Sequence, residues 1–484
     1  METPAVTPAV RKGFFRRLMS WRGALFLLAA FITFAALLLA EENWRGTRAW
    51  QNYKRQMEAK GERFDAARLI PPKVPDDENL ATIAFFTNKN ADAGPMTGQA
   101  NQFEWPNHPH RPTSWPYAVA DDLIEWVKAF RGRSAEPVQA ASTVLDYLNQ
   151  REPVLARLES VSQRPYYRFN IPYEEWGNEA VGTALLEHLA RLKQLFQLLS
   201  LHAEAEMVSG RTDQALNDIN VMFRIDDGLK DEPLLISQLV RLACAVIMLQ
   251  PIGEGLAEHR WSEAQLRVLQ ERLQKTDLIA SMVQATYGER DICSNPAFDR
   301  GEMFPMFLRG WNRLEQLNIN LAFHNMVLPR IDLAARKISP SVNRSIDVAF
   351  KKFSDGNWFH IVFIQHSIYA RMLMPAFSRD PQKTAFAQSE VDMAMLACAL
   401  ERYRLAQGQY PEELNALVPR FVAVLPHDII NGQPLKYRRA GNGRFILYSV
   451  GWNEKDDGGI VATNKDNHQD ILQGDWVWQY PEGN

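Results

Sequence analysis

The residues that could do chemistry are few, and the clearest pair is Glu174-Glu175 in the segment YEEWGNE. Aromatic residues surround this pair in the sequence, at Tyr166, Tyr167, Tyr173 and Trp176. Carboxylates among aromatic rings are typical of carbohydrate sites, but glycoside hydrolysis needs two carboxylates roughly 5–9.5 Å apart that face one cleft. Adjacent residues do not provide this geometry. A carboxylate-dependent hydrolase is therefore the alternative hypothesis and not the first one.

Two histidine pairs lack the spacing of a metal site. His108 and His110 lie in a segment rich in Pro and Trp with no third ligand at helical or strand spacing, which favours an irregular packed segment. His360 and His366 are six residues apart and do not share one helix face. The sequence also contains no G-x-S-x-G, H-E-x-x-H or Walker motif. These patterns predict no reaction.

The three cysteines, Cys244, Cys293 and Cys398, are far apart and form neither a C-x-x-C pair nor a zinc spacing. Cys244 and Cys398 lie in apolar segments, which favours small buried hydrophobic residues. One disulfide stays open as an alternative, because an exported body would fold in an oxidising compartment.

The element that positions the rest of the chain is the apolar run from Gly23 to Ala40, which has no charged residue. A membrane-spanning helix needs about 20 residues, with a lower limit of about 17–18. We therefore predict a transmembrane anchor at residues 23–40. A cleaved secretory signal is the competing interpretation, but its apolar centre has about 7–15 residues and ends in small residues, unlike Leu38-Leu39-Ala40.

Charges on the two sides of this run predict its orientation. Basic residues precede it, at Arg11, Lys12, Arg16, Arg17 and Arg22, whereas Glu41 and Glu42 follow it directly. Basic flanks of a span are retained in the cytoplasm. We therefore expect a cytoplasmic tail at residues 1–22 and a periplasmic body held at a bacterial inner membrane.

Composition predicts that this body folds into more than one domain. The chain has 484 residues, of which 46% are hydrophobic and 23% are charged, as in ordinary globular proteins. A net charge of −3 and the lack of a long basic run beyond the N-terminus give no sign of nucleic-acid binding. Residues 41–80 are predicted to form a juxtamembrane helix followed by a linker rich in proline.

Residues 81–380 are predicted to form a helical domain. Leucines recur at the three-and-four spacing of one helix face, at Leu185, Leu189, Leu192, Leu195 and Leu199. Residues 203–229 resemble one helix-turn-helix unit of a tetratricopeptide repeat, with a generic helical hairpin as the alternative. The apolar segment 234–252 contains Gln238 and Arg241, so a buried core helix is favoured over a second span.

Residues 381–484 are predicted to form a small α+β module. A helix that begins near Ala385 ends near Gly408, a residue that suits a helix C-cap, and a short second helix follows at residues 412–418. The segment PLKYRRAGNGRFILYSVG then predicts two antiparallel strands around the turn Gly441-Asn442-Gly443. The module is therefore expected to be a helix packed on a small antiparallel sheet.

This module resembles the globular part of the major pseudopilins of bacterial type II secretion, over about residues 393–459. The matching residues lie at the helix end, at the entry to the sheet and in the strand that leaves it: Leu400, Tyr403, Gly408, Tyr410, Pro411, Gly432, Pro434, Tyr437 and Leu447-Tyr448-Ser449-Val450-Gly451. The N-terminus departs from the pilin pattern, because Leu18 stands where pilins have a glutamate. The whole arrangement also resembles uncharacterised bacterial proteins with a single anchor, a helical middle and this same ending.

The resemblance implies a calcium site in the loop after the strand, where this chain has the segment WNEKDDGG. Asp456 and Asp457 supply hard carboxylate oxygens, Gly458-Gly459 allows a tight turn, and Asp470 or Asp475 would close the site. We take Asp456, Asp457 and Asp475 as the candidate calcium ligands. A solvated acidic turn without a metal stays open as the alternative.

These observations predict a mainly α protein with an N-terminal transmembrane helix, a helical and repeat-like middle domain and a C-terminal α+β module. The expected function is that of a single-pass periplasmic scaffold or partner-binding protein of the bacterial envelope, linked to secretion or surface assembly, with no catalysis. Its expected partners are the lipid bilayer and other envelope proteins, and no nucleic acid.

Overall fold

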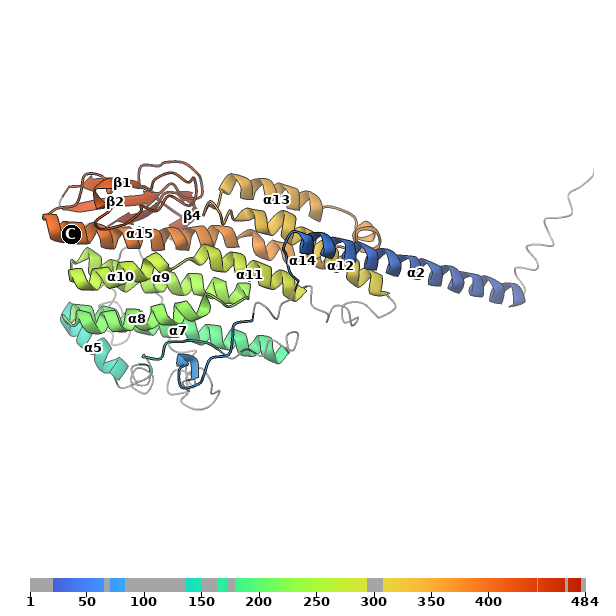
Figure 1. Ribbon diagram of the computed structural model, residues 1–484, viewed down its shortest axis with the longest axis horizontal. Coiled ribbons are helices and arrows are strands. Elements are labelled where there is room, and N and C mark those ends of the chain that lie inside the picture. The colour runs from blue at the N-terminus through green and yellow to red at the C-terminus, as the bar shows by residue number, and fades with distance from the viewer. Residues whose placement is uncertain are drawn as a thin grey trace, which may run out of the picture. The chain divides into compact units, whose positions relative to one another are not determined.

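The computed structural model describes residues 21–64, 70–82, 136–149, 158, 163–169, 171, 179–293, 308–441, 443–465 and 469–479. The fold is mainly helical, with an N-terminal apolar helix and a small C-terminal antiparallel sheet, as the sequence predicts (Figure 1). The chain divides into two compact units. Unit 1 comprises Met1–Asp65, Asp291–Ala322 and Gly356–Met372, and unit 2 comprises Ala66–Arg290, Phe323–Asp355 and Leu373–Asn484.

Unit 1 is built around one long helix, α2 (Trp21–Ala59), which joins the predicted anchor and the predicted juxtamembrane helix without a break. The apolar window of α2 has none of its residues buried, and its large side chains, such as Phe31 and Ile32, are exposed. Figure 1 shows this half of α2 projecting by itself. An exposed apolar helix of this length is compatible with a single membrane anchor.

The other half of α2 packs against α12 (Arg309–Ala322). Three side chains of α2 are buried there, Trp50, Tyr53 and Met57, and Leu317 and Leu321 of α12 pack against them. The side of this half of α2 that carries Trp50 and Tyr53 is therefore the face that α12 covers. Unit 1 also contains η8 (His360–Gln365), one turn of π-helix, and most of α14 (Ile368–Leu373).

Unit 2 contains a stack of helices, of which α7 to α11 follow one another through short turns (Figure 1). Its α-helices before the C-terminal module are α5 (Pro137–Asn149), α7 (Glu179–Val208), α8 (Thr212–Leu229), α9 (Leu235–Ala257), α10 (Glu263–Lys275), most of α11 (Leu278–Cys293) and α13 (Pro340–Ser354). Its short helical turns are η2 (Leu80–Thr82), η6 (Phe323–Val327), η7 (Leu328–Arg330) and η9 (Met374–Ser378). Helices α7 and α8 form a hairpin around Gly210, whose φ of 79° lies in the left-handed region.

The apolar segment at residues 234–252 forms part of α9, and 61% of the apolar window of α9 is buried inside the protein. By length and composition α2 and α9 are the helices, among the described residues, that could cross a membrane. Arg241, near the middle of α9, forms an ion pair with Asp226 of α8, and both side chains are buried. A charge pair of this kind belongs to a protein core, as the sequence interpretation favoured.

The C-terminal module begins with α15 (Asp380–Gln407), which is buried around most of its circumference between residues 387 and 401. The sheet contacts one side of α15, whereas α9 and α10 contact another (Figure 1). The burial of α15 is not limited to apolar residues, since Glu390 and Asp392 are also buried. Gly408 follows α15 with a φ of 76°, which confirms the predicted C-cap.

The sheet of the module is antiparallel, in the order β1-β2-β5. Strands β1 (Lys436–Ala440) and β2 (Arg444–Ser449) form the predicted hairpin, in which Ala440 pairs with Arg444. Strand β5 (Trp476–Gln479) adds to β2, and β3 (Val461–Thr463) pairs with β4 (Gln469–Gly474) in a separate ribbon. The predicted short helix at residues 412–418 is the 3-10 turn η10 (Leu414–Leu417).

Candidate functional site

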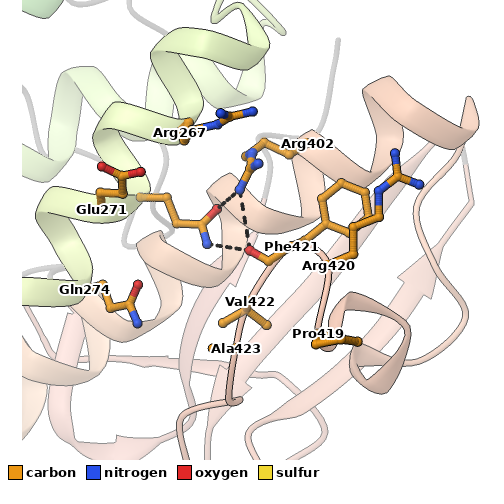
Figure 2. Close-up of a pocket in the computed structure, with 10 residues that line it drawn as sticks. Arg267, Glu271, Gln274, Arg402, Pro419, Arg420, Phe421, Val422 and Ala423 are labelled. Carbon is orange, nitrogen blue, oxygen red and sulfur yellow. Dashed lines mark hydrogen bonds between the residues drawn. The ribbon is translucent and has the colours of Figure 1, made fainter.

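A polar groove of about 250 Å³ lies within unit 2, between α10, α15 and the segment that follows η10. Figure 2 shows its two sides, with Arg267, Glu271 and Gln274 on α10 facing residues 419–423, and Arg402 of α15 between them. The residues that line the groove are Arg267, Gln270, Glu271, Gln274, Arg402, Pro419, Arg420, Phe421, Val422 and Ala423.

The α10 side of the groove follows from helical periodicity. Ser262 begins the helix with a capping box, in which its hydroxyl accepts from the Gln265 N–H and the Gln265 side chain accepts from the Ser262 N–H. The polar lining residues of α10 recur at the spacing of one helix face, at 267, 270, 271 and 274. The leucines at 266, 269 and 273 face the core, so this helix is fixed by its apolar side.

The floor of the groove is held by hydrogen bonds that join the helical stack to the C-terminal module (Figure 2). The backbone carbonyl of Phe421 accepts a hydrogen bond of 2.7 Å from Nε2 of Gln270. Arg402 donates through Nη1 to Oε1 of Gln270 at 2.9 Å and through Nη2 to Oε1 of Glu263 at 2.9 Å. Because Arg402 is engaged in this way, its guanidinium is a structural part of the floor.

The lining of the groove is more basic than acidic, because its charged residues are three arginines and one glutamate. Arg420 is exposed, and its guanidinium lies 5.2 Å from the centre of the Phe421 ring, a cation–π arrangement. Arg267 is more than half exposed and pairs with Glu263 at 3.2 Å. The hydrogen bond from Arg402 lowers the pKa of Glu263, which stays ionised beside the groove. Arg267 and Arg420 are therefore the accessible cations of the site.

A second polar cluster fixes the end of α15 beside Arg402. Glu401 accepts hydrogen bonds from the hydroxyl of Tyr410 at 2.6 Å and from Nη2 of Arg404 at 2.7 Å, and Nδ1 of His259 lies 2.9 Å from it. Burial opposes ionisation, but these bonds lower the pKa of Glu401 to about 2. Tyr410, singled out in the sequence, thus serves to hold the helix end, through a glutamate that the sequence analysis missed.

The predicted calcium ligands Asp456 and Asp457 lie in the loop between β2 and β3, and Asp475, between β4 and β5, contacts that loop, but protein donors already engage these carboxylates. Asp475 is buried and accepts the backbone N–H groups of Gly459 at 2.6 Å and Asp457 at 3.2 Å. Asp456 lies 3.1 Å from Nζ of Lys436 and accepts from the hydroxyl of Tyr448. Within the described part of the chain, no group of three or more His, Cys, Asp or Glu residues is arranged to hold a metal ion.

This donor set does not fit a calcium ion as it stands. The ammonium group of Lys436 forms an ion pair with Asp456, and each carboxylate oxygen of Asp475 accepts a hydrogen bond from a backbone N–H. Calcium requires six to eight oxygen ligands. Calcium binding at this loop therefore stays a prediction from the resemblance, and no step of the function proposed below uses it.

Other candidates from the sequence divide into described and undescribed residues. Glu174, Glu175, His108 and His110 lie outside the described residues, so the hydrolase alternative stays a prediction. Burial raises the pKa of the Cys244 and Cys398 thiols, which are both free, in keeping with small hydrophobic core residues.

The groove itself was missed by the sequence analysis. The polar spacing on α10 was available as a signal, but the contact between Gln270 and Phe421 joins residues 151 positions apart.

A scan against family models, a search of curated proteins and a search of solved structures each find no match to this chain.

Proposed function

We propose that this chain is a membrane-anchored scaffold that binds a protein partner at the bacterial envelope through the groove between α10 and residues 419–423. The observation that carries the proposal is this groove, whose floor is fixed by internal hydrogen bonds while two arginines of its rim face solvent. Preorganised walls bind a partner at lower entropic cost than mobile ones.

The chemistry of the rim favours an acidic polypeptide segment. Arg267 and Arg420 are accessible cations on opposite sides of the groove, and guanidinium groups bind carboxylates through paired hydrogen bonds. The volume of about 250 Å³ lies below the roughly 300–1,000 Å³ of typical small-molecule pockets. A shallow polar groove of this kind suits an extended segment with one or two acidic side chains better than a metabolite.

The location of the scaffold rests on α2. Its exposed apolar half supports a transmembrane anchor, and the basic residues before it support a cytoplasmic N-terminus with the body in the periplasm. We infer that the anchor holds the groove close to partners of the inner membrane, with a role in secretion or surface assembly. Extraction of membranes with alkaline carbonate should leave the full-length chain in the membrane pellet.

Photo-crosslinking in cells tests the groove. A photoreactive phenylalanine at Gln274 should form a discrete adduct, whereas the same probe at Ile460, which is also exposed but does not line the groove, should not form it. The charge reversal Arg267→Glu with Arg420→Glu should abolish the adduct at Gln274. An adduct that survives the reversal, or that also forms at Ile460, would refute groove-mediated binding.

A further inference from the structure

A turn of unit 1 exposes several large apolar side chains to solvent. Trp358, Phe359 and Ile364 are 67%, 56% and 56% exposed, and Met372, in the same unit, is 70% exposed. The first three flank or lie in η8. Soluble proteins seldom leave contiguous apolar side chains uncovered unless the patch binds something.

Hydrogen bonds brace the backbone of this turn, both within the turn and from α12. The N–H of Ser367 donates to the carbonyl of Ile361 at 3.3 Å, which folds the segment back on itself. The N–H groups of His360 and Ile361 donate to the side chain and the carbonyl of Asn357 at 2.9 Å and 3.1 Å. Asn318 of α12 donates to the carbonyls of Gln365 and His366 at 2.7 Å each.

The braced turn is docked beside the end of the apolar run of α2. Nε2 of His366 lies 3.6 Å from Oε2 of Glu42, and the rings of His366 and Trp311 are 5.0 Å apart. Glu42 comes two residues after Ala40, which ends the apolar run, and this separation corresponds to about 3 Å along a helix. Trp44, also on α2, is largely exposed at this same level.

We propose that the turn Asn357–Gln365 inserts into the headgroup layer of the membrane and forms a second lipid contact beside the anchor. This inference rests on the proposed transmembrane role of α2. Tryptophan and other aromatic side chains prefer the membrane interface, where the ring meets acyl chains and polar groups meet water. The turn has both kinds of group, since Asn357, His360 and Gln365 accompany its apolar residues.

A lipid surface fits this patch better than a protein partner because the turn that carries it contacts α2 next to the end of the apolar run. Both belong to unit 1, and the contact of His366 with Glu42 sets their relative height. A second contact would also limit the rotation and tilt of α2, since a single helix has only one line of attachment to the bilayer.

Three matched isoleucines allow a direct test in the full chain. Ile32 of α2, Ile364 of the turn and Ile460 of the C-terminal module are 57%, 56% and 66% exposed. Each is replaced by cysteine in a Cys293→Ser background, labelled with an environment-sensitive fluorophore, and the chain is reconstituted in vesicles of phosphatidylethanolamine and phosphatidylglycerol. The buried thiols of Cys244 and Cys398 should not label. Quenching is measured with lipids that carry a nitroxide near the headgroup and, separately, with lipids that carry it deep in the acyl chains.

The result expected is strong quenching at Ile364→Cys, at least threefold above that at Ile460→Cys, with a blue-shifted emission. Adding Trp358→Ser and Phe359→Ser should lower the quenching at Ile364→Cys towards the Ile460→Cys level. Strong quenching at Ile32→Cys by deep nitroxides, with Ile364→Cys no different from Ile460→Cys, would overturn this inference and leave the anchor intact. Failure to quench Ile32→Cys would instead refute the anchor, and this inference with it.

Discussion

Gly46 of α2 and Gly310 of α12 bring two helix backbones into direct contact. A Cβ atom added to Gly46 would lie 2.3 Å from the carbonyl oxygen of Gly310, and one added to Gly310 would lie 2.3 Å from the carbonyl oxygen of Glu42. The N–H of Gly310 donates to Oδ1 of Asn43 at 2.5 Å. Small residues at such crossings allow helices to pack closely, and here they fix α12 immediately beyond the apolar run.

Replacing Gly46 with leucine should separate these helices and destabilise unit 1. The clash would be with backbone, which cannot move away as a flexible side chain can, so we expect a loss of about 1–3 kcal/mol. Hydrogen exchange of residues 309–322 in detergent micelles should become faster. Gly441→Leu is the control, because nothing lies within 4 Å of a Cβ added there. Equal exchange in both variants would contradict the close contact.

The ion pair of Arg241 with Asp226 should be essential to the core of unit 2. Two hydrogen bonds join them, at 2.8 Å and 2.7 Å, and both side chains are 2% exposed. Asp226→Ala would leave a buried guanidinium without its counter-charge, which costs about 3–5 kcal/mol. Urea unfolding should show this loss. Arg344→Ala, which breaks a more exposed ion pair with Glu454, should cost below about 1 kcal/mol.

Patterns of hydrophobicity and turn residues were sufficient to predict much of this fold. The unbroken apolar run predicted α2, the Gly441-Asn442-Gly443 turn predicted the β1-β2 hairpin, and Arg241 within an apolar segment predicted a buried helix. Each of these signals is local, since it depends on residues that are neighbours in sequence. The continuation of α2 through residues 41–59 is also a local property. The sequence predicted two separate elements there only because the composition changes at Glu41.

The groove and the apolar turn could not be predicted in the same way. Arg402, Gln270 and Phe421 meet only after three segments of unit 2 have packed together. The turn at Trp358 has an apolar sequence that equally suits a core element, and its exposure is a property of the folded unit. The burial of Glu390 was likewise hidden, because a helix covered on several sides does not show a single apolar stripe.

Glu390 should make stability depend on pH. Burial raises its pKa to about 8, compared with 4.5 in an unfolded chain. Between these values the folded state keeps the proton while the unfolded state releases it, so the free energy of unfolding falls as pH rises from about 4.5 to about 8. Glu390→Gln stays neutral throughout and should lose this dependence. Thermal unfolding of both chains from pH 5 to pH 9 measures the difference.

The control for this titration is Glu413→Gln, a substitution of an exposed glutamate in the same module. The melting temperature of this variant should equal that of the wild type at every pH, because the side chain at 413 is exposed to solvent in the folded and in the unfolded chain. A Glu390→Gln curve parallel to the wild-type curve across the whole range would show that this carboxyl does not retain its proton in the folded protein.

Substitutions at Arg402 and Arg420 should have different effects, the first on the stability of the protein and the second on binding in the groove. Arg402→Gln removes hydrogen bonds to Glu263 and Gln270 and should lower the free energy of unfolding by about 1.5–3 kcal/mol. Arg420→Gln changes an exposed side chain and should cost below about 0.5 kcal/mol, while it weakens the crosslink from Gln274. Urea titration and crosslink yield measure the two effects. A stability loss at Arg420→Gln as large as that at Arg402→Gln would refute this division.

Asp475 should stabilise the C-terminal module in the absence of any metal. Its buried carboxylate accepts the N–H groups of Gly459 and Asp457, and Asp475→Asn would turn a donor towards one of them, which costs about 1–3 kcal/mol. The melting temperature should therefore fall equally in EDTA and in calcium. Asp470→Asn, at a half-buried position of β4, is the control. A calcium-dependent rise in the wild-type melting temperature that Asp456→Asn abolishes would instead support the ligand set expected from the sequence, because only a bound ion links those carboxylates to stability in that way.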